Sequence, residues 1–511
     1  MSIDSQQKNQ IDSVITLFSN NQLEEALAKV NILIKSYPNE SLLFNIAGAC
    51  YAGLQQFDKA VDLYKQAILI NPDYSKALYN LADTYHELNN FDEALKSYEK
   101  AIKINPNFAE AHNNLGNLFG DFGQLGQAIK SYKNAIALNS NYLEAQYSLS
   151  IIFQNLEEFE DMIVYLKKVI AIKPDFAEAH HNLGIAYNGL GQFDNSVDAF
   201  RAAIVINPDY LEAHNNLGDA LKELDQLEDA IHSYENAIAL QPDYPILHNN
   251  LGDTLKELGK FDDAIKSYKK AISFNTENPD SHNRLGVIFF ERDELEKAIS
   301  AFEKALSIDP NYEDALNNLG VVLNKSGFIE GAVECYEKAL SINPNYSDAL
   351  KNKGVALKKL GRIEEATISY EKALLIDPND ADTLNNIGIT LMNSERLEEA
   401  IKSYEKAIKL KPEYADAYNN LSIAFMKLKQ LDEALKLNKK ALSLKLDFAE
   451  GYAIQGRIFS ELKQFNEALV SFEKANLINP DLAYNLGSIL STKMDLCDWK
   501  DLTNLLDKLK N

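Results

Sequence analysis

Nine asparagines recur at intervals of 34 residues or twice that number: Asn80, Asn114, Asn182, Asn216, Asn250, Asn318, Asn352, Asn386 and Asn420. A side-chain amide donates and accepts hydrogen bonds, as a peptide group does. Asn is on the order of a few tenths of a kcal/mol worse than Ala in an exposed helix. We therefore predict an amide ladder that holds the backbone of an extended peptide, the alternative being that Asn is simply common at this place in a repeat.

Five of the eight histidines share a second register with the same period: His112, His180, His214, His248 and His282. A row of metal sites is one interpretation. Neighbouring helix axes lie about 8–10 Å apart, however, whereas zinc requires nitrogens at about 2.1 Å. No thiolate or carboxylate shares the register. We predict packing histidines, with no metal and no cofactor.

No pattern in the chain predicts catalysis. Gly116, Gly120, Gly123 and Gly126 do not fit G-x-G-x-x-G and follow no strand, so they predict no nucleotide loop. A nucleophile paired with a base is also missing, and we assign no catalytic residues.

Charged residues accompany the asparagine ladder. Asp83, Asp219 and Asp253 each lie three residues after a ladder asparagine and predict a preference for hydroxyl-rich or basic peptides, unless they are simply solvated acids. Ten repeats carry a further acid four residues before the ladder position, where the dipole of a first helical turn favours it. A basic cluster begins at Lys351 and ends at Arg362. It is interpreted as a solvated face or as a contact for an acidic segment.

The elements that position these residues are pairs of helices. In the stretch Asn207–Pro242, Leu217, Leu221 and Leu224 follow a helical period, and Ala230 to Ile238 repeats it after a short turn. Small residues stand where the two helices approach each other. Proline ends the preceding helix at most repeats, because it lacks a donor and clashes with the turn before it, and Ser140, Thr276 and Leu446 replace it at the others.

The same 34-residue pattern covers Ser41 to Leu482 as thirteen repeats with no insertion or deletion. Counting from Ser41 as position 1, position 8 is Gly in ten repeats, position 20 is Ala in eleven, and position 24 is Tyr or Phe in eleven. Residues 1–40 are predicted to form a degenerate capping repeat. Residues 483–511 are predicted to form a truncated repeat and a connector or capping helix.

These signatures resemble the tetratricopeptide repeat. The resemblance implies an all-α, right-handed superhelical solenoid whose concave groove is lined by positions 2, 6, 9 and 13 of each first helix, while positions 4, 7, 8 and 11 face the core. Some co-chaperone members of the family clamp a terminal carboxylate with Lys at position 5 and Asn at position 9. Lys351 matches the first of these, but Val355 departs from the second.

The composition of the chain limits the classes of partner that it is expected to bind. The net charge of −24 over 511 residues repels phosphate, which argues against nucleic acid and anionic membranes. The first twenty residues contain no basic segment followed by an apolar one, and no apolar run is long enough to span a bilayer. Cys50, Cys335 and Cys497 are few and far apart, which predicts a reducing, cytoplasmic location.

The end of the chain carries a second resemblance. Cys497-Asp498-Trp499, after a shortened repeat, is similar to the junction that joins the repeats to the catalytic domain in the O-linked N-acetylglucosamine transferase family. The resemblance implies a substrate-recruiting role, although the catalytic half is absent from these residues. The helical stripe of Trp499, Leu502, Leu505, Leu506 and Leu509 predicts a partner domain or self-association.

Two functions follow as alternatives. The first is a non-catalytic scaffold that binds extended peptide segments of other proteins in its groove. The second is the recruiting region of a protein O-linked N-acetylglucosamine transferase, truncated or completed by a separate catalytic domain.

Overall fold

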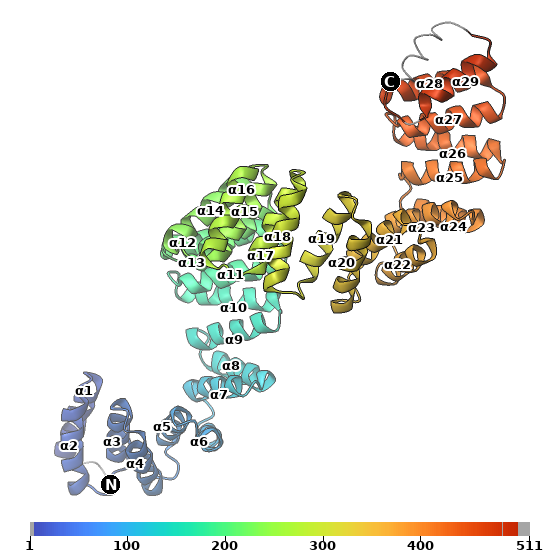
Figure 1. Cartoon of the computed structure of the whole chain (residues 1–511). Coiled ribbons are helices and arrows are strands. Elements are labelled where there is room, and N and C mark those ends of the chain that lie inside the picture. Colours follow the sequence, from blue (N-terminus) through green and yellow to red (C-terminus); the bar gives the residue numbers. More distant parts are fainter. Residues whose placement is uncertain (1–4, 483, 499–511) are drawn as a thin grey trace. The chain divides into compact units, whose positions relative to one another are not determined.

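The computed structural model describes residues 5–482 and 484–498, and these form 29 helices and no strand (Figure 1). The predicted all-α class is confirmed. None of the described helices is both long and apolar enough to cross a membrane. Trp499 and the leucines after it lie outside the described residues, so the predicted C-terminal apolar stripe stays a prediction.

Each repeat contributes a first helix of 13 residues and a second of 14. The first helices are α3 (Ser41–Gly53), α5 (Ser75–Glu87), α7 (Ala109–Asp121), α9 (Leu143–Asn155), α11 (Ala177–Gly189), α13 (Leu211–Glu223), α15 (Pro245–Glu257), α17 (Pro279–Glu291), α19 (Glu313–Lys325), α21 (Ser347–Lys359), α23 (Ala381–Asn393), α25 (Ala415–Lys427) and α27 (Ala449–Glu461).

The second helices alternate with them: α4 (Phe57–Ile70), α6 (Phe91–Ile104), α8 (Leu125–Leu138), α10 (Phe159–Ile172), α12 (Phe193–Ile206), α14 (Leu227–Leu240), α16 (Phe261–Phe274), α18 (Leu295–Ile308), α20 (Ile329–Ile342), α22 (Ile363–Ile376), α24 (Leu397–Leu410), α26 (Leu431–Leu444) and α28 (Phe465–Ile478). Helices α1 (Ser5–Ser19) and α2 (Leu23–Ser36) precede the repeats, and α29 (Asn485–Asp495) follows them.

Local sequence explains where these helices stop. The turn inside every repeat contains one residue with a positive φ, which is Gly in five repeats, such as Gly123 with φ 66°, and a polar residue such as Asp225 in the others. In most repeats the turn to the next repeat is held by an Asn or Asp side chain that accepts from the backbone two residues on, as Asn207 Oδ1 does from Asp209 N. Pro245 and Pro279 stand at the start of α15 and α17, where proline is tolerated.

The small residue at position 8 is fixed by the aromatic ring at position 24 of the same repeat. A Cβ added to Gly184 would lie 2.5 Å from Phe200 Cε1, and one added to Gly388 would lie 2.5 Å from Tyr404 Cε1. Real Cβ atoms essentially never approach a ring carbon this closely, so glycine at these two positions admits the ring without displacement. The repeat of Tyr98 has Ala82 at position 8 instead. The predicted close approach of the two helices is confirmed.

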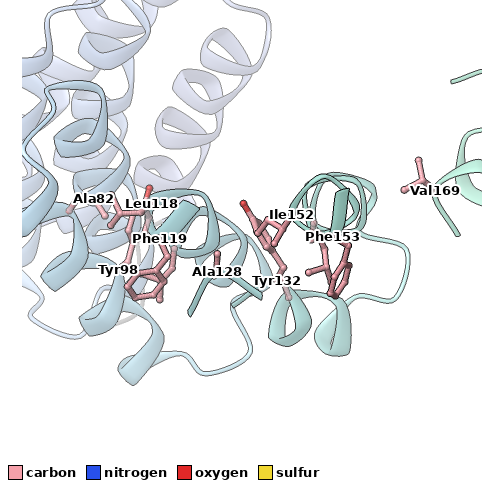
Figure 2. Close-up of a cluster of buried hydrophobic side chains, with 14 of the residues drawn as sticks. Ala82, Tyr98, Leu118, Phe119, Ala128, Tyr132, Ile152, Phe153 and Val169 are labelled. Atoms are coloured by element: carbon pink, nitrogen blue, oxygen red, sulfur yellow. The ribbon is translucent and has the colours of Figure 1, made fainter. Parts of the chain in front are cut away.

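The core runs continuously through each series of repeats. Figure 2 shows Tyr98, Phe119 and Tyr132 from successive helices in one buried cluster. The repeat 143–176 departs most from the common pattern, yet its Met162, Leu166 and Val169 are fully buried in the same cluster. Met162 and Val169, which are larger than the usual alanines, and Leu166, which is smaller than the usual aromatic ring, therefore fill the core together.

The helices fall into an N-terminal part, up to Leu258, and a C-terminal part, from Gly259. Within each part consecutive helices pack against one another, and the first helices of neighbouring repeats, such as α19 and α21, also touch. The first helices thus form one continuous row in each part. We call the stripe of positions 2, 6, 9 and 13 on this row the ladder face.

Candidate binding face

The ladder asparagines bridge neighbouring repeats. The Nδ2 of Asn250 donates to Oδ1 of Asn215 at 3.0 Å, and Asn352 donates in the same way to Asn317 at 3.0 Å. Eight of the nine donate such a bond to the position-5 side chain of the repeat before, at 2.9–3.1 Å, and in the case of Asn216 the acceptor is His181 Nε2. The ladder is therefore partly structural.

Position 5 is the residue that the sequence interpretation missed. It is a buried asparagine in several repeats, including Asn113, Asn317 and Asn419. Its signal was visible as the repeated Asn-Asn pair at positions 5 and 6. Position 5 lies within contact distance of the next first helix, so its side chain orients the ladder amide of that helix.

The ladder amides differ in how many of their groups are already used. Asn114 donates to Tyr79 Oη at 2.9 Å and to Asp83 Oδ1 at 2.8 Å, and its Oδ1 accepts from Asn113 at 3.0 Å. Asn352 makes one bond, which leaves one N–H and the Oδ1 for a ligand. The same hydrogen-bonding groups remain available in Asn80, Asn250, Asn318 and Asn420.

Lys351 interrupts this pattern. It stands at position 5, where it cannot accept a hydrogen bond, and the side chain of Asn386 in the next repeat has no hydrogen-bond partner among the described residues. The Lys351 ammonium instead lies 2.9 Å from Asp348 Oδ1 and 3.5 Å from Asp380 Oδ2. The hydrogen bond that Lys351 donates to Asp348 is the main cause that raises the pKa of Lys351. A carboxylate ligand at Lys351 must compete with these two acids.

The acids at position 9 anchor a tyrosine hydroxyl from position 24. Tyr234 Oη donates to Asp219 Oδ1 at 2.6 Å, and Tyr98 Oη donates to Asp83 Oδ1. Burial raises the pKa of Asp219. Asp253 lies at the same place on α15, half-buried, and it too has a polar interaction. These three predicted ligand residues are therefore engaged within the fold, which reduces the charge they offer a peptide.

In the C-terminal part the same tyrosines lose their partner. Position 9 is Val321, Val355 and Ile389 in three consecutive repeats. The hydroxyls of Tyr336, Tyr370 and Tyr404, fully buried residues of those repeats, have no hydrogen-bond partner among the described residues. Burying a hydroxyl without a partner disfavours folding.

This contrast gives a first prediction. We expect Tyr234→Phe to destabilise its repeat by about 1–3 kcal/mol, because it removes a hydrogen bond to a carboxylate. Tyr370→Phe is expected to leave stability unchanged or raise it by up to about 1 kcal/mol, because it removes an orphaned hydroxyl. Hydrogen exchange of the amides in α14 and α22 measures both effects. Equal losses in the two variants would show that the Tyr370 hydroxyl is bonded in solution.

The histidine register is explained by the turns between repeats. The Nε2 atoms of His112, His180, His214 and His248 lie 2.8–3.1 Å from the carbonyl oxygens of Pro106, Pro174, Pro208 and Pro242. A neutral imidazole with its proton on Nε2 donates this bond. Gln146 Nε2 reaches the Ser140 carbonyl in the corresponding place. Position 4 thus closes the proline turn, in line with the predicted packing role.

His181 belongs to the ladder and gives a pH prediction. Its Nε2 accepts from Asn216 Nδ2, so the proton lies on Nδ1, 3.2 Å from Tyr210 Oη. Burial lowers its pKa below the usual 6.5. The folded state therefore resists protonation, and stability is complete above the unfolded pKa and falls as pH drops below it, by at most about 1.4 kcal/mol per pH unit.

We expect the protection factors of the amides in α11 and α13, which are corrected for the intrinsic pH dependence of hydrogen exchange, to fall between pH 7 and pH 5. The His181→Asn variant, which carries the residue found at position 5 of other repeats, should lose this fall. A variant that keeps the full pH response would place its origin elsewhere.

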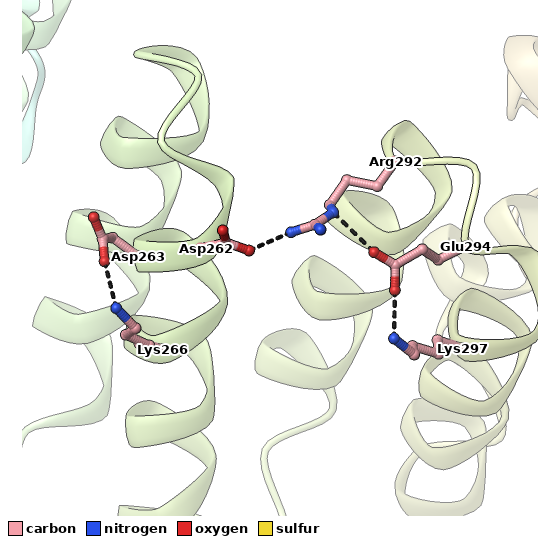
Figure 3. A network of polar contacts seen from close by, with 6 residues as sticks. All are labelled: Asp262, Asp263, Lys266, Arg292, Glu294 and Lys297. Atoms are coloured by element: carbon pink, nitrogen blue, oxygen red, sulfur yellow. Dashed lines mark hydrogen bonds and ion pairs between the residues drawn. The ribbon is translucent and has the colours of Figure 1, made fainter.

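Most of the other basic side chains around Lys351 are paired. Lys353 lies 2.8 Å from Glu337, Lys325 lies 2.7 Å from Asp293, and Arg362 makes a fork with Glu365. Figure 3 shows a comparable surface network, in which Arg292 bridges Asp262 and Glu294. Exposed pairs of this kind contribute little to stability. They cancel much of the charge of the basic cluster.

Comparison with known families agrees with the geometry. Models described as TPR repeat match residues 82–121, 186–225, 218–259, 252–291, 288–327 and 390–429, and models described as tetratricopeptide repeat match nine further segments. Together the matches cover 41–176, 186–445 and 449–482. The chain belongs to the tetratricopeptide repeat proteins, a class of helical repeat scaffolds.

Several solved structures resemble the chain. The Cut9–Hcn1 hetero-tetramer of APC/C aligns over 94% of this chain and 95% of that one, with 15% identity and a TM-score of 0.41. Yeast Tom70 aligns over 86% and 99%, with 16% identity and a TM-score of 0.38. YrrB, described as a TPR protein with an unusual peptide-binding site, aligns over 37% and 96%, with 24% identity and a TM-score of 0.33. Scores this low say nothing about how this chain binds a partner.

No curated protein matches the chain. The resemblance to the O-linked N-acetylglucosamine transferase family is therefore not confirmed, and it rests on the sequence motif alone.

Proposed function

We propose that the chain is a protein-binding scaffold whose ladder face holds extended segments of other proteins by their main chain. The observation that carries this proposal is the half-used state of the ladder amides. In Asn80, Asn250, Asn318, Asn352 and Asn420, one N–H is fixed by the neighbouring repeat, and one N–H and one carbonyl oxygen remain.

The fixed bond orients the remaining groups in advance. A ligand then loses less conformational freedom of the receptor when it binds, so the affinity per contact rises. All five side chains are half-buried, which shields their hydrogen bonds from water. An extended backbone offers one donor and one acceptor per residue and matches this chemistry whatever its side chains.

Asn352 and Asn114 form a matched pair that tests the proposal. Both occupy position 6, but Asn352 has free groups and Asn114 does not. We expect Asn352→Ala to weaken capture of partner proteins by about 0.5–1.5 kcal/mol, with little dependence on salt. Asn114→Ala should leave capture unchanged and lower the stability of its repeat.

Affinity capture from lysate at two salt concentrations, with thermal unfolding alongside, separates these effects. Equal loss of capture in both variants would show that free amide groups do not bind the partner.

A second candidate is the substrate-recruiting region of a protein O-linked N-acetylglucosamine transferase whose catalytic domain is encoded separately. The motif Cys497-Asp498-Trp499 favours it. Within the described residues, Asp498 is tied to α29 by a contact of 3.3 Å to Lys493. A reading frame for a glycosyltransferase immediately downstream of Asn511 would support this candidate over the first.

We also propose a cytoplasmic location for the protein, on the basis of its cysteines. Cys50 and Cys335 are buried free thiols, and burial raises the pKa of both. Unpaired cysteines are typical of a reducing compartment.

A further inference from the structure

The ladder face changes its chemistry within the C-terminal part. From Val287 to Ile423, position 9 is aliphatic in five consecutive repeats: Val287, Val321, Val355, Ile389 and Ile423. All five are half-buried, and the last four pack against the buried cluster that contains Tyr336, Tyr370 and Tyr404. We call this row the aliphatic stripe. In the N-terminal part, position 9 is Asp or Asn in four repeats.

The fold does not require this stripe. Where position 9 is polar, it pairs with a tyrosine hydroxyl, as Asn117 does with Tyr132 at 2.7 Å. In several other repeats an aliphatic position 9 is accompanied by an apolar position 24, as in the pairs Ile151 and Leu166, Ile185 and Phe200, and Val287 and Phe302. Over Val321, Val355 and Ile389 the chain instead keeps three orphaned hydroxyls. Local rules that are broken without a gain in stability mark functional surfaces.

Charged rows border the stripe on both sides. Asp314, Asp348, Asp382 and Asp416 lie exposed at position 2, at the start of each first helix. Lys325, Lys359 and Lys427 lie exposed at position 13, near its end. The ladder amides separate the acidic row from the stripe. Asp348 is paired with Lys351, whereas Asp382 and Asp416 have no ion-pair partner among the described residues. A segment with basic side chains complements the acidic row.

The spacing of the stripe selects the conformation of that segment. Neighbouring first helices touch, so their axes lie about 8–10 Å apart. A polyproline II helix advances about 9.3 Å in three residues and turns once, so every third side chain faces the same way. In a β-strand every second side chain points the same way, and these side chains are about 6.6 Å apart. Their spacing does not match the distance between neighbouring first helices.

We propose that the aliphatic stripe binds a polyproline II segment with an aliphatic side chain at every third residue and basic residues between. This inference rests on the proposed function, because the ladder amides beside the stripe hold the main chain of the same segment. It adds the partner's conformation, its side-chain period and its charge.

The test uses the full chain and a synthetic 15-residue peptide with the repeated sequence Leu-Pro-Lys, labelled for fluorescence anisotropy. A control peptide has the same composition, but its leucines are alternately two and four residues apart. We expect the regular peptide to bind at least about tenfold more tightly than the control at 0.5 M salt, where charge attraction is screened.

The matched variants change position 9 in each part. The triple variant Val321→Thr, Val355→Thr and Ile389→Thr places a hydroxyl near each orphaned tyrosine. Thr has the shape of Val and is one carbon shorter than Ile, so the fold of the variant is checked by circular dichroism. This variant should lower the affinity for the regular peptide by about tenfold or more. The variant Ile151→Thr with Ile185→Thr in the N-terminal part should change binding less than about twofold.

Equal binding of both peptides, or unchanged binding in the triple variant, would overturn the inference. One outcome is that the triple variant keeps its lysate partners while loss of the ladder asparagines releases them. In that outcome the partners are bound through their main chain, and the aliphatic stripe does not bind them. If neither change releases the lysate partners, the proposed function fails as well.

Discussion

A variant in which Asn216, Asn250, Asn318, Asn352 and Asn386 are all replaced by Ala is expected to lose at least about a hundredfold in affinity for its protein partners. Each amide contributes about 0.5–1.5 kcal/mol of binding free energy, and five independent contacts therefore sum to several kcal/mol. Single replacements are expected to be mild, since the binding energy is spread along the row.

The structure revises what this variant should do to stability. From the sequence, the alanines are expected to preserve or raise helicity. Four of the five amides donate to the preceding repeat, however, so each replacement also removes a bond worth about 0.5–1.5 kcal/mol. The better helix propensity of Ala, about 0.5 kcal/mol per site, offsets part of this loss.

A stability control is available in the same chain. Gly120 and Gly126 lie in helices with nothing within 4 Å of an added Cβ, so Gly120→Ala and Gly126→Ala are expected to restore the lost stability. Binding is then measured by calorimetry on the compensated variant, with folding checked by circular dichroism. A compensated variant that still binds like the natural sequence would show that recognition does not use the asparagines.

Gly184→Ala is expected to reduce stability although it adds only one methyl group. Its Cβ would lie 2.5 Å from Phe200 Cε1, and the ring is 1% exposed and held on all sides. Either α11 and α12 separate or the ring leaves its rotamer, at a cost of about 1–3 kcal/mol. The helix propensity gained by Ala, about 0.5–1 kcal/mol, does not compensate.

Gly120→Ala in α7 is the control, because the same change there meets no atom and should raise stability by about 0.5–1 kcal/mol. Hydrogen exchange resolves both changes repeat by repeat, since each repeat contacts only its neighbours. Gly184→Ala combined with Phe200→Leu should recover part of the loss. If both glycine variants were stabilised alike, helix packing would be looser than the structure shows.

The fold could be predicted from the sequence because the residues that determine the structure of a repeat lie within that repeat. The positions of Gly218, Ala230 and Tyr234 define how two helices pack, and the turn residues near Asp225 and Pro208 define where they stop. All of these interactions span fewer than 34 residues, so local patterning was sufficient. The ladder asparagines and the three aspartates were found in the same way.

What these residues do was decided by contacts about 35 residues away in sequence. Asn250 meets Asn215, and Asn386 faces Lys351, only because the first helices of neighbouring repeats touch. The sequence does not distinguish the rings of Tyr336, Tyr370 and Tyr404 from those of the other repeats. The structure shows that their hydroxyls have no hydrogen-bond partner among the described residues. The sequence by itself determined which side chains repeat, since periodicity is local. The tertiary structure alone decided which of their hydrogen-bonding groups are used within the fold and which remain for a partner, because that depends on pairing between helices.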